Sequence, residues 1–231
     1  MKNILLIGGS YGIGLAIAKE IESGNNVFVA SRTNENLEDL NVTHIPFDAL
    51  NDTLDLSTLP AVIDGLVYCP GSINLRPFRG LKPEAFENDL QINFISLVKV
   101  IQSILPNLTA SEQSSIVLFS SVAVSMGMPF HTSVAASKGA IEGFAKALAA
   151  EYAPKIRVNV IAPSLTDTPL ADKFLNNETK QEKSAERHPL KRFGKPDDIA
   201  QMASFLLSDK SSWISGQTFN VDGGMSTLLA N

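Results

Sequence analysis

The sequence predicts an α/β fold in which a doubly wound parallel sheet is covered by helices on both faces. Short apolar runs alternate along the chain with longer segments in which apolar residues recur at helical spacing. The strand-like runs are apolar throughout, which is typical of parallel strands buried on both sides. No Gly/Ser-rich or Pro-rich linker and no repeat interrupts this alternation. We therefore expect residues 1–231 to form one domain with right-handed crossovers.

The composition narrows the class of protein. The chain has 231 residues, is 44% hydrophobic and 19% charged, and carries a formal net charge of -5. A chain of this size buries about 70% of the surface that it exposes when unfolded, and its composition argues against intrinsic disorder. The acidic balance argues against nucleic-acid binding, and a single cysteine fits a reducing compartment. The apolar run at residues 4–7 is too short for a signal peptide, and we expect no apolar stretch of membrane-spanning length. These features predict a cytoplasmic protein with no membrane partner and no metal site.

The first half of the chain contains four predicted strands. An apolar run at residues 3–7 ends at two glycines and indicates a buried strand. From Ile13 the apolar residues recur every three or four positions, which predicts a helix that ends near Gly24. The remaining elements are strands at 27–30, 43–47 and 65–68 and a short helical piece at 36–40.

The second half continues the alternation. Pro83 suits the first turn of a long helix that we expect to reach Leu105. A second long helix is predicted from near Val134 to Tyr152. The polar stretch at 176–187 is either a lid over a site or a solvated surface helix without a role. The other predicted elements are strands at 116–120, 157–162 and 218–221 and a helix at 196–207.

A glycine-rich turn joins the first strand to the first helix. Glycines at this junction leave room for a pyrophosphate, and the helix N-terminus offers free N–H groups and the positive end of its dipole. An ordinary tight turn is the alternative explanation. The residues that we predict to contact a dinucleotide here are Gly8, Ser10, Tyr11, Gly12, Ile13 and Gly14.

The end of the second strand indicates which dinucleotide is preferred. An acidic side chain there would accept hydrogen bonds from the ribose 2′-hydroxyl and repel a 2′-phosphate. This chain instead has Ser31, Arg32 and Thr33, which can pair with or donate to a phosphate. The residues therefore favour NADP as the cofactor, with NAD as the alternative. Asp48, at the end of the third strand, is either an acceptor for the adenine amino group or an ordinary turn residue or helix cap.

Further motifs lie at fixed places along the whole chain. They are Asn93, Ser120-Ser121, Ala136-Ser137-Lys138-Gly139-Ala140, Arg157-Val158-Asn159, Ala162-Pro163, Gly216-Gln217 and Val221-Asp222-Gly223-Gly224. Together with the glycine turn, they resemble the short-chain dehydrogenase/reductase family, in particular its branch of 3-oxoacyl-carrier-protein reductases. The resemblance implies a Rossmann-like fold with a seven-stranded parallel sheet, hydride transfer between a carbonyl or alcohol substrate and NAD(P), and assembly as a homodimer or homotetramer.

The resemblance also implies a catalytic set of Asn, Ser, Tyr and Lys. Asn93, Ser121 and Lys138 match this set by spacing. The tyrosine is expected four residues before Lys138 and thirteen after Ser121, and both counts reach Val134. Since valine has no proton to donate to the developing alkoxide, an activity that uses the family's general acid is in doubt.

Three interpretations of Val134 are open. In the first, another group supplies the proton: His131, one helical turn before Val134, or more weakly Ser121, Ser133 or a water held by Lys138. Alternatively, His131 is an ordinary loop histidine before a helix, with no role in the reaction. In the second interpretation, the protein binds a dinucleotide but turns over little, as a sensor or a silent subunit. In the third, valine is not the native residue at this position.

Other positions around the expected cofactor also depart from the family pattern. Cys69-Pro70-Gly71 replaces Asn-Ala-Gly, with Gly71 keeping the turn, and Pro163-Ser164 replaces Pro-Gly. Thr168 matches the threonine that contacts the nicotinamide carboxamide, or it caps a helix before Pro169. Tyr11 stands where NADP-preferring relatives commonly have arginine. We therefore predict Gly71, Pro163, Thr168 and Lys138 as further cofactor contacts, and the cofactor half of the site looks better preserved than the proton-transfer half.

Overall fold

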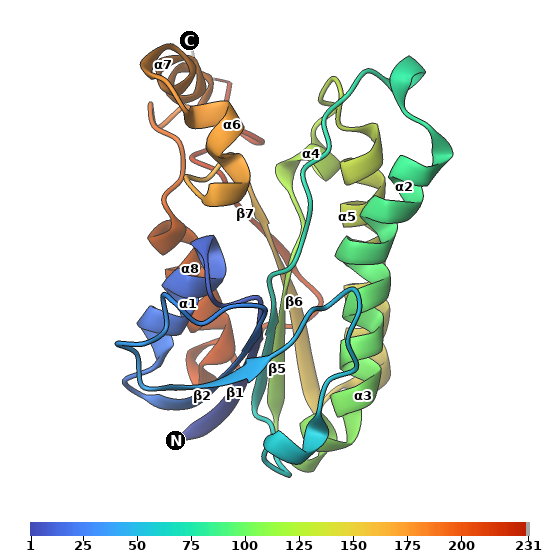
Figure 1. Ribbon diagram of the computed structural model, residues 1–231, viewed down its shortest axis with the longest axis vertical. Coiled ribbons are helices and arrows are strands. Elements are labelled where there is room, and N and C mark those ends of the chain that lie inside the picture. Colours follow the sequence, from blue (N-terminus) through green and yellow to red (C-terminus); the bar gives the residue numbers. More distant parts are fainter. Residues whose placement is uncertain (230–231) are drawn as a thin grey trace.

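The computed structural model describes residues 1–229 and shows a seven-stranded parallel sheet between two layers of helices (Figure 1). The strand order is β3-β2-β1-β4-β5-β6-β7, and every pair is parallel. The strands are β1 (Lys2–Ile7), β2 (Asn25–Ser31), β3 (Val42–Pro46), β4 (Gly65–Tyr68), β5 (Ser114–Phe119), β6 (Ile156–Pro163) and β7 (Thr218–Val221). This is the Rossmann-like, doubly wound fold that the sequence predicts.

Alternation along β1 shows how the two faces of the sheet are filled. Leu5 and Ile7 belong to one hydrophobic core and Ile4 and Leu6 to the other, because successive side chains of a strand point to opposite faces. The first core is covered by α3 (Ser96–Ala110) and α5 (Thr132–Tyr152), with α2 (Pro83–Leu90) packed against α5. The second core is covered by α1 (Gly12–Ile21) and α8 (Pro196–Leu207) (Figure 1). All-apolar strands are thus explained by burial on both sides.

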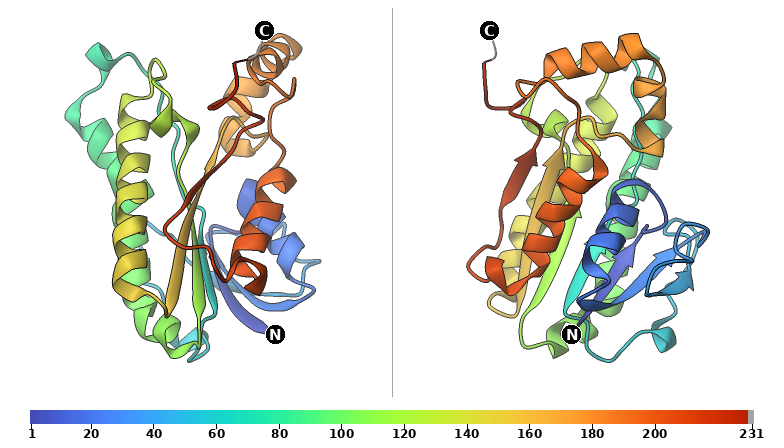
Figure 2. Two further views of the ribbon diagram at one scale, coloured as in Figure 1. Left: turned by 180° about the vertical axis from the view of Figure 1, so that it is seen from behind. Right: turned by 90° about the vertical axis from the view of Figure 1, so that its left-hand side faces the viewer.

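The shorter helices lie in the connections. The α-helices are α4 (Val122–Ser125), α6 (Asp172–Leu175) and α7 (Glu178–Arg187), and the 3-10 helices are η1 (Leu56–Thr58), η2 (Phe78–Gly80), η4 (Pro169–Ala171) and η5 (Asp209–Ser211). Helix α7 lies at the end of the molecule opposite the N-terminus (Figure 2). Because β1 starts at the N-terminal end, α7 stands near the carboxyl ends of the strands.

The strand order reverses between β1 and β4. From β1 the chain builds β2 and β3 on one side, and from β4 it builds β5, β6 and β7 on the other. The last paired residues are Ile7 and Tyr68, and the Cys69 N–H still donates to the Ile7 carbonyl at 3.0 Å. Beyond them the two connections separate to opposite faces and leave a crevice, which is where open α/β sheets bind ligands.

Two predicted elements differ from the structure. The helical piece at 36–40 is wrong, since residues 35–39 form consecutive turns. Asn34, Asn36 and Asp39 favour turns because their short polar side chains compete for local backbone groups. The long helix begins at Pro83 as predicted but reaches Ala110, with a π-helical turn, η3 (Gln91–Ile95), between α2 and α3. The elements predicted at 65–68, 196–207 and 218–221 have the observed bounds, and the remaining boundaries differ by at most three residues.

The helical segment from Pro83 to Ala110 is, by length and composition, long and apolar enough to cross a membrane. We had expected no apolar stretch of membrane-spanning length, and this expectation is wrong. Its apolar residues Leu97, Ile101, Ile104 and Leu108 are all buried in the core against the sheet. The segment is therefore the core helix of a packed domain.

Arg157 ties the end of α8 to the sheet. From β6 its Nη1 donates to the carbonyls of Leu206 and Ser211 and to the Ser211 hydroxyl, and its Nη2 donates to the Ser208 carbonyl, all at 2.9–3.2 Å. Its neighbour Asn159 is bonded to the next segment through the Ile214 carbonyl. This part of the Arg-Val-Asn motif is therefore structural.

We predict that Arg157→Met lowers the free energy of unfolding by about 3 kcal/mol, because several buried carbonyls lose a charged donor. Chemical denaturation measures the effect. The matched control is Arg192→Met, which removes an exposed pair with Asp198 and should cost less than about 1 kcal/mol. Equal losses in the two variants would contradict the role assigned to Arg157.

Candidate functional site

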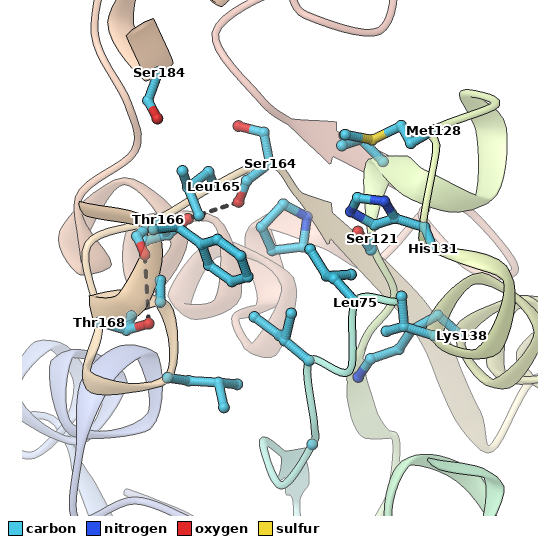
Figure 3. A pocket seen from close by; sticks show the side chains of 18 of the residues that line it. Leu75, Ser121, Met128, His131, Lys138, Ser164, Leu165, Thr166, Thr168 and Ser184 are labelled. Carbon is cyan, nitrogen blue, oxygen red and sulfur yellow. Dashed lines mark hydrogen bonds between the residues drawn. The ribbon is translucent and has the colours of Figure 1, made fainter. Parts of the chain in front are cut away.

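A cavity of about 460 Å³ opens at the carboxyl ends of the central strands (Figure 3). One side is formed by the loops after β4 and β5 and the first turns of α5, and the other by the loop after β6 with α6 and α7. Ile13 from the glycine turn reaches its edge. In Figure 3, Ser121, His131 and Lys138 lie across from Thr166 and Thr168. The predicted site residues that line this cavity are Ile13, Gly71, Ser121, His131, Lys138, Pro163 and Thr168.

The glycine turn is packed tightly, and Gly14 and Gly12 show this most directly. A Cβ on Gly14 would lie 2.2 Å from the Gly8 carbonyl oxygen. The backbone of the turn therefore lies directly against Gly14, the first buried residue of α1. Gly12 has φ +53° and would place a Cβ 3.3 Å from Thr168. The turn is thus compact, and it brings the N-terminus of α1 against the loop after β6.

The residues predicted to choose the dinucleotide form a small polar group beside this turn. Ser31 donates to the Thr33 carbonyl at 2.8 Å, and Thr33 donates to the Ser10 hydroxyl at 3.3 Å. Arg32 is exposed. The Tyr11 hydroxyl donates to Glu35 at 3.0 Å. Glu35 was not predicted as a site residue, because it is 24 residues from Tyr11 in the chain and only the fold brings the two side chains together.

Asp48 lies apart from the cavity, in the turn after β3. Its Oδ1 accepts from the Leu50 N–H at 2.9 Å and its Oδ2 from the Asn51 amide at 3.2 Å. Both oxygens thus accept hydrogen bonds within the turn.

Asn93, Gly71 and Lys138 converge at the floor of the cavity. A Cβ on Gly71 would lie 2.9 Å from Asn93 Oδ1 and 3.2 Å from Lys138 Nζ, which shows how closely the loop after β4 approaches both side chains. The π-helical turn carries Asn93, whose Oδ1 accepts from the Ser72 N–H and whose Nδ2 donates to the Asp89 carbonyl at 2.8 Å. Asn93 is thereby fixed against the loop after β4.

Lys138 is buried in α5, and its Nζ donates to the Phe119 carbonyl at the end of β5 at 3.0 Å. Burial lowers the pKa of Lys138 to about 8, against smaller opposing effects of Cys69 and Asp89. Burial also raises the pKa of the neighbouring Cys69 thiol to about 12. The lysine therefore titrates near neutrality, while the thiol stays protonated.

The two serines after β5 are oriented differently. Ser120 donates to Glu142 at 2.5 Å and is tied to α5. The Ser121 oxygen caps α4 by accepting from the Ala123 N–H at 3.2 Å, which leaves its hydroxyl proton available to the cavity that it lines. Of the two hydroxyls, only that of Ser121 has its proton free to contact a ligand in the cavity.

Val134 and His131 stand at the start of α5. Val134 lines the cavity with 5% of its surface exposed, so this part of the wall is apolar. His131 is the residue before the first turn, and its carbonyl accepts from the Ala135 N–H. Its Nδ1 donates to the Pro129 carbonyl at 2.7 Å, so Nε2 is the nitrogen free to accept. His131 therefore faces the cavity in the way that the first interpretation of Val134 requires.

Two polar groups at the site were not identified from the sequence. Buried Asp89 accepts from the hydroxyls of Ser72 at 2.6 Å and Ser133 at 2.5 Å. Across the cavity, His188 forms a hydrogen bond with Ser164 at 2.9 Å. Neither group shows a motif, because the partners are 17 to 44 residues apart in the chain.

The helix α7 supplies the mouth of the cavity. Lys180, Lys183 and Arg187 recur at spacings of three and four, on one face of α7, and all three line the cavity with Lys173 of α6. Among the lining residues in the described part of the chain there is no aspartate or glutamate. The polar stretch at 176–187 thus lies over the site, as the lid alternative requires.

The lowered pKa of Lys138 predicts how stability depends on pH. Between about pH 8 and the ordinary lysine value of 10.5, the unfolded chain binds more protons at this side chain than the folded chain. The contribution of Lys138 to the free energy of unfolding should therefore rise with pH across this window. Denaturation at several pH values should show a shallower rise in Lys138→Met than in the unaltered protein. Lys146→Met, at an exposed position of α5, controls for the loss of one charge, and a slope unchanged in Lys138→Met would contradict the assignment.

Comparisons with known proteins agree with this geometry. A family model described as Enoyl-(Acyl carrier protein) reductase matches residues 8–226. A 3-oxoacyl-[acyl-carrier-protein] reductase, FabG, of Thermotoga maritima is 32% identical over 97% of both chains. The ligand-free aldohexose dehydrogenase of Thermoplasma acidophilum is 28% identical, with a TM-score of 0.89 over 99% of this chain and 95% of that one. A gluconate 5-dehydrogenase from Burkholderia cenocepacia, solved with NADP and tartrate, shares the fold at 24% identity, with a TM-score of 0.90 over 99% and 96% of the chains. The chain, with its glycine turn, buried lysine and matched length, belongs to the short-chain dehydrogenase/reductase family of oxidoreductases.

Proposed function

We propose that this protein transfers hydride between a carbonyl or alcohol substrate and NADP(H), with NAD(H) as the alternative cofactor. The observation that carries the proposal is the continuity of one cavity, which runs from Ile13 at the glycine turn to Ser121 and Lys138. The residues present fit a dinucleotide, because the glycines of the turn place no side chains between its backbone and the N-terminus of α1, where a phosphate can bind. Thr168 lies beside Gly12 at this end of the helix. When bound, the nicotinamide would supply the hydride.

The chain's own residues then have distinct roles. The glycine turn and α1 bind the pyrophosphate, and Ser31 with Arg32 binds the ribose 2′-substituent. Lys138 holds the nicotinamide ribose, while Asn93 keeps the loop after β4 against it. Ser121 donates to the substrate oxygen. The remaining requirement of the reaction is a proton for that oxygen.

The cations at the mouth define the class of substrate. The whole chain has a net charge of -5, yet its cavity is lined by Lys138, Lys173, Lys180, Lys183 and Arg187. Within residues 1–229 no ion pair neutralises Lys183 or Arg187. A positive potential in an otherwise negative surface attracts anions. We therefore infer that the substrate carries a negative charge, and that this charge faces the cations of α7.

A second function is favoured by one observation. Val134 presents an apolar wall at the position where the family resemblance implies the tyrosine. A protein that binds the dinucleotide but turns over little needs no general acid, and a sensor or silent subunit would be of this kind. Assembly as a homodimer or homotetramer and a cytoplasmic location are proposed from the family membership and the composition.

The two functions are separated by nucleotide binding and turnover measured together. We expect NADPH to bind more tightly than NADH, and the unaltered protein to reduce a carbonyl with NADPH. Lys138→Met should weaken nucleotide binding and abolish most turnover. Arg32→Ala should reduce the preference for NADPH while leaving NADH binding within a few-fold.

The variant Val134→Tyr distinguishes the hydride-transfer enzyme from the protein that binds a dinucleotide but turns over little. Turnover that appears only in Val134→Tyr would establish a disabled relative and overturn the enzymatic proposal. Turnover that falls on this substitution would show that valine suits a different chemistry. Failure of the protein to bind either nucleotide would contradict both functions.

The substrate class is tested with pairs of ketones that differ only by a carboxylate and its methyl ester. The acid should have a kcat/KM roughly tenfold or more higher than the ester at low salt, because the cationic mouth concentrates anions. The double variant Lys183→Glu, Arg187→Glu should remove or invert this preference. Lys155→Glu, at an exposed position beyond the opposite end of α5, is the matched control for charge. A preference for the ester in the unaltered protein would contradict the inference.

A further inference from the structure

Ser164 and His188 form a hydrogen-bonded pair in the wall of the 460 Å³ cavity. Ser164 comes directly after β6, and His188 is the residue that ends α7. The distance from His188 Nε2 to Ser164 Oγ is 2.9 Å. The imidazole is 2% exposed, whereas the Ser164 side chain faces the cavity beside Leu165 (Figure 3). A buried base is thus connected to a hydroxyl that a ligand can reach.

The other ring nitrogen of His188 fixes the direction of this bond. Nδ1 lies 2.6 Å from the Ser184 carbonyl oxygen, which can only accept. Nδ1 therefore carries a proton in every state of the ring. In neutral His188, Nε2 accepts from the Ser164 hydroxyl. In protonated His188, Nε2–H donates to Ser164 Oγ, and the hydroxyl proton is free to point into the cavity.

The backbone around Ser164 holds this geometry. Its carbonyl accepts from the Thr166 hydroxyl at 3.1 Å, and its N–H donates to the Val221 carbonyl at 3.4 Å. A nucleophile or acid that is bonded to a base, with the base oriented by a third group, is the arrangement that active hydroxyls share in enzymes. The Ser164 hydroxyl is therefore positioned to exchange a proton between His188 and a ligand in the cavity.

We propose that Ser164, supplied by His188, protonates the substrate oxygen in carbonyl reduction, in place of a side chain at Val134. The inference rests on the hydride transfer proposed above. In the reductive step the carbonyl carbon accepts hydride from the reduced nicotinamide, which is oxidised, and a C–H bond forms as the C=O π pair moves to oxygen. The oxygen then takes the Ser164 proton, and Ser164 takes the Nε2 proton of His188. The products are the alcohol, the oxidised nicotinamide and neutral His188, and alcohol oxidation runs the same transfers in reverse.

A second cavity provides for the return of the proton. Ser164 and His188 also line a space of about 140 Å³ bordered by Gly194, Asp198 and Asp222. His188 thus borders a space separate from the first cavity, and the proposal returns the proton to the ring from this side. One solvent proton per turnover restores the protonated ring, so the stoichiometry of carbonyl reduction is met.

A double-variant cycle tests the pair. We expect Ser164→Ala to lower kcat by about 10² to 10⁴ in the unaltered background, as the loss of a general acid does, with the Kd for NADPH within a few-fold. In the Val134→Tyr background the tyrosine supplies the proton, and Ser164→Ala should lower kcat by less than about tenfold. His188→Gln keeps a donor of similar size but cannot release a proton, and it should match Ser164→Ala in both backgrounds. Ser103→Ala, on α3 outside the cavity, is the control for the loss of a partly buried hydroxyl.

Three results would overturn the inference. Equal losses from Ser164→Ala in both backgrounds would show a structural role. Unchanged turnover in Ser164→Ala would remove the hydroxyl from the reaction. A loss from His131→Ala that Val134→Tyr cancels, without one from Ser164→Ala, would assign the proton to His131. In each of these cases the unaltered protein still reduces a carbonyl, so the proposed function stands.

A protein that binds NADPH but reduces no carbonyl would instead overturn both the function and the pair. Where Val134→Tyr itself fails to turn over, the solvent isotope effect replaces the second background. Turnover by the unaltered protein should slow in D₂O through the serine–histidine transfer. The residual turnover of Ser164→Ala should lose that part of the effect, and an undiminished effect would contradict the proposal.

Discussion

The parallel pairing of β1 with β4 is the constraint on which the rest of the structure depends. It places the ends of two strands side by side while their connections leave toward opposite faces of the sheet. The crevice that results receives the glycine turn from one side and the loop after β4 from the other. Gly14 against the Gly8 carbonyl, and Gly71 against Asn93 and Lys138, are the contacts that make these loops fit. Each would be disturbed by a single added Cβ.

The buried polar groups of the site are distributed unevenly around this crevice. On the α5 side, Lys138 is held by the Phe119 carbonyl, and Asp89 by the hydroxyls of Ser72 and Ser133, while Val134 presents only methyl groups. On the opposite side Ser164 and His188 combine a hydroxyl with an ionisable ring. The α5 wall thus presents valine where the family resemblance implies a tyrosine, and the opposite wall carries a hydroxyl bonded to an ionisable ring. This distribution is the basis of the proposal that the proton comes from Ser164.

Charge adds a second level of selectivity. The exposed cations of α7 lie over a cavity whose described lining holds no carboxylate, in a chain that is acidic as a whole. On the substrate class proposed above, such a mouth would attract the anion and orient it before the reacting groups meet. The same helix ends at His188, so the element that attracts the substrate also positions the proposed proton relay.

The sequence by itself determined the parallel α/β fold, the glycine turn and the family, because strand burial, helical spacing and motif spacing are local or linear properties. It singled out Asn93, Ser121, His131, Lys138 and Thr168, which the structure brings to one cavity or its floor, and it drew attention to Val134 in the wall of that cavity. It mistook the turns at 35–39 for a helix; in the structure Asn36 of this segment donates to the distant Ser10 carbonyl, a contact that no local pattern reveals. Only the tertiary structure decided that Ser164 meets His188, that Glu35 approaches Tyr11, and that the basic face of α7 points into the cavity. These are contacts between segments far apart in the chain or choices of helix orientation, and packing rather than spacing sets them.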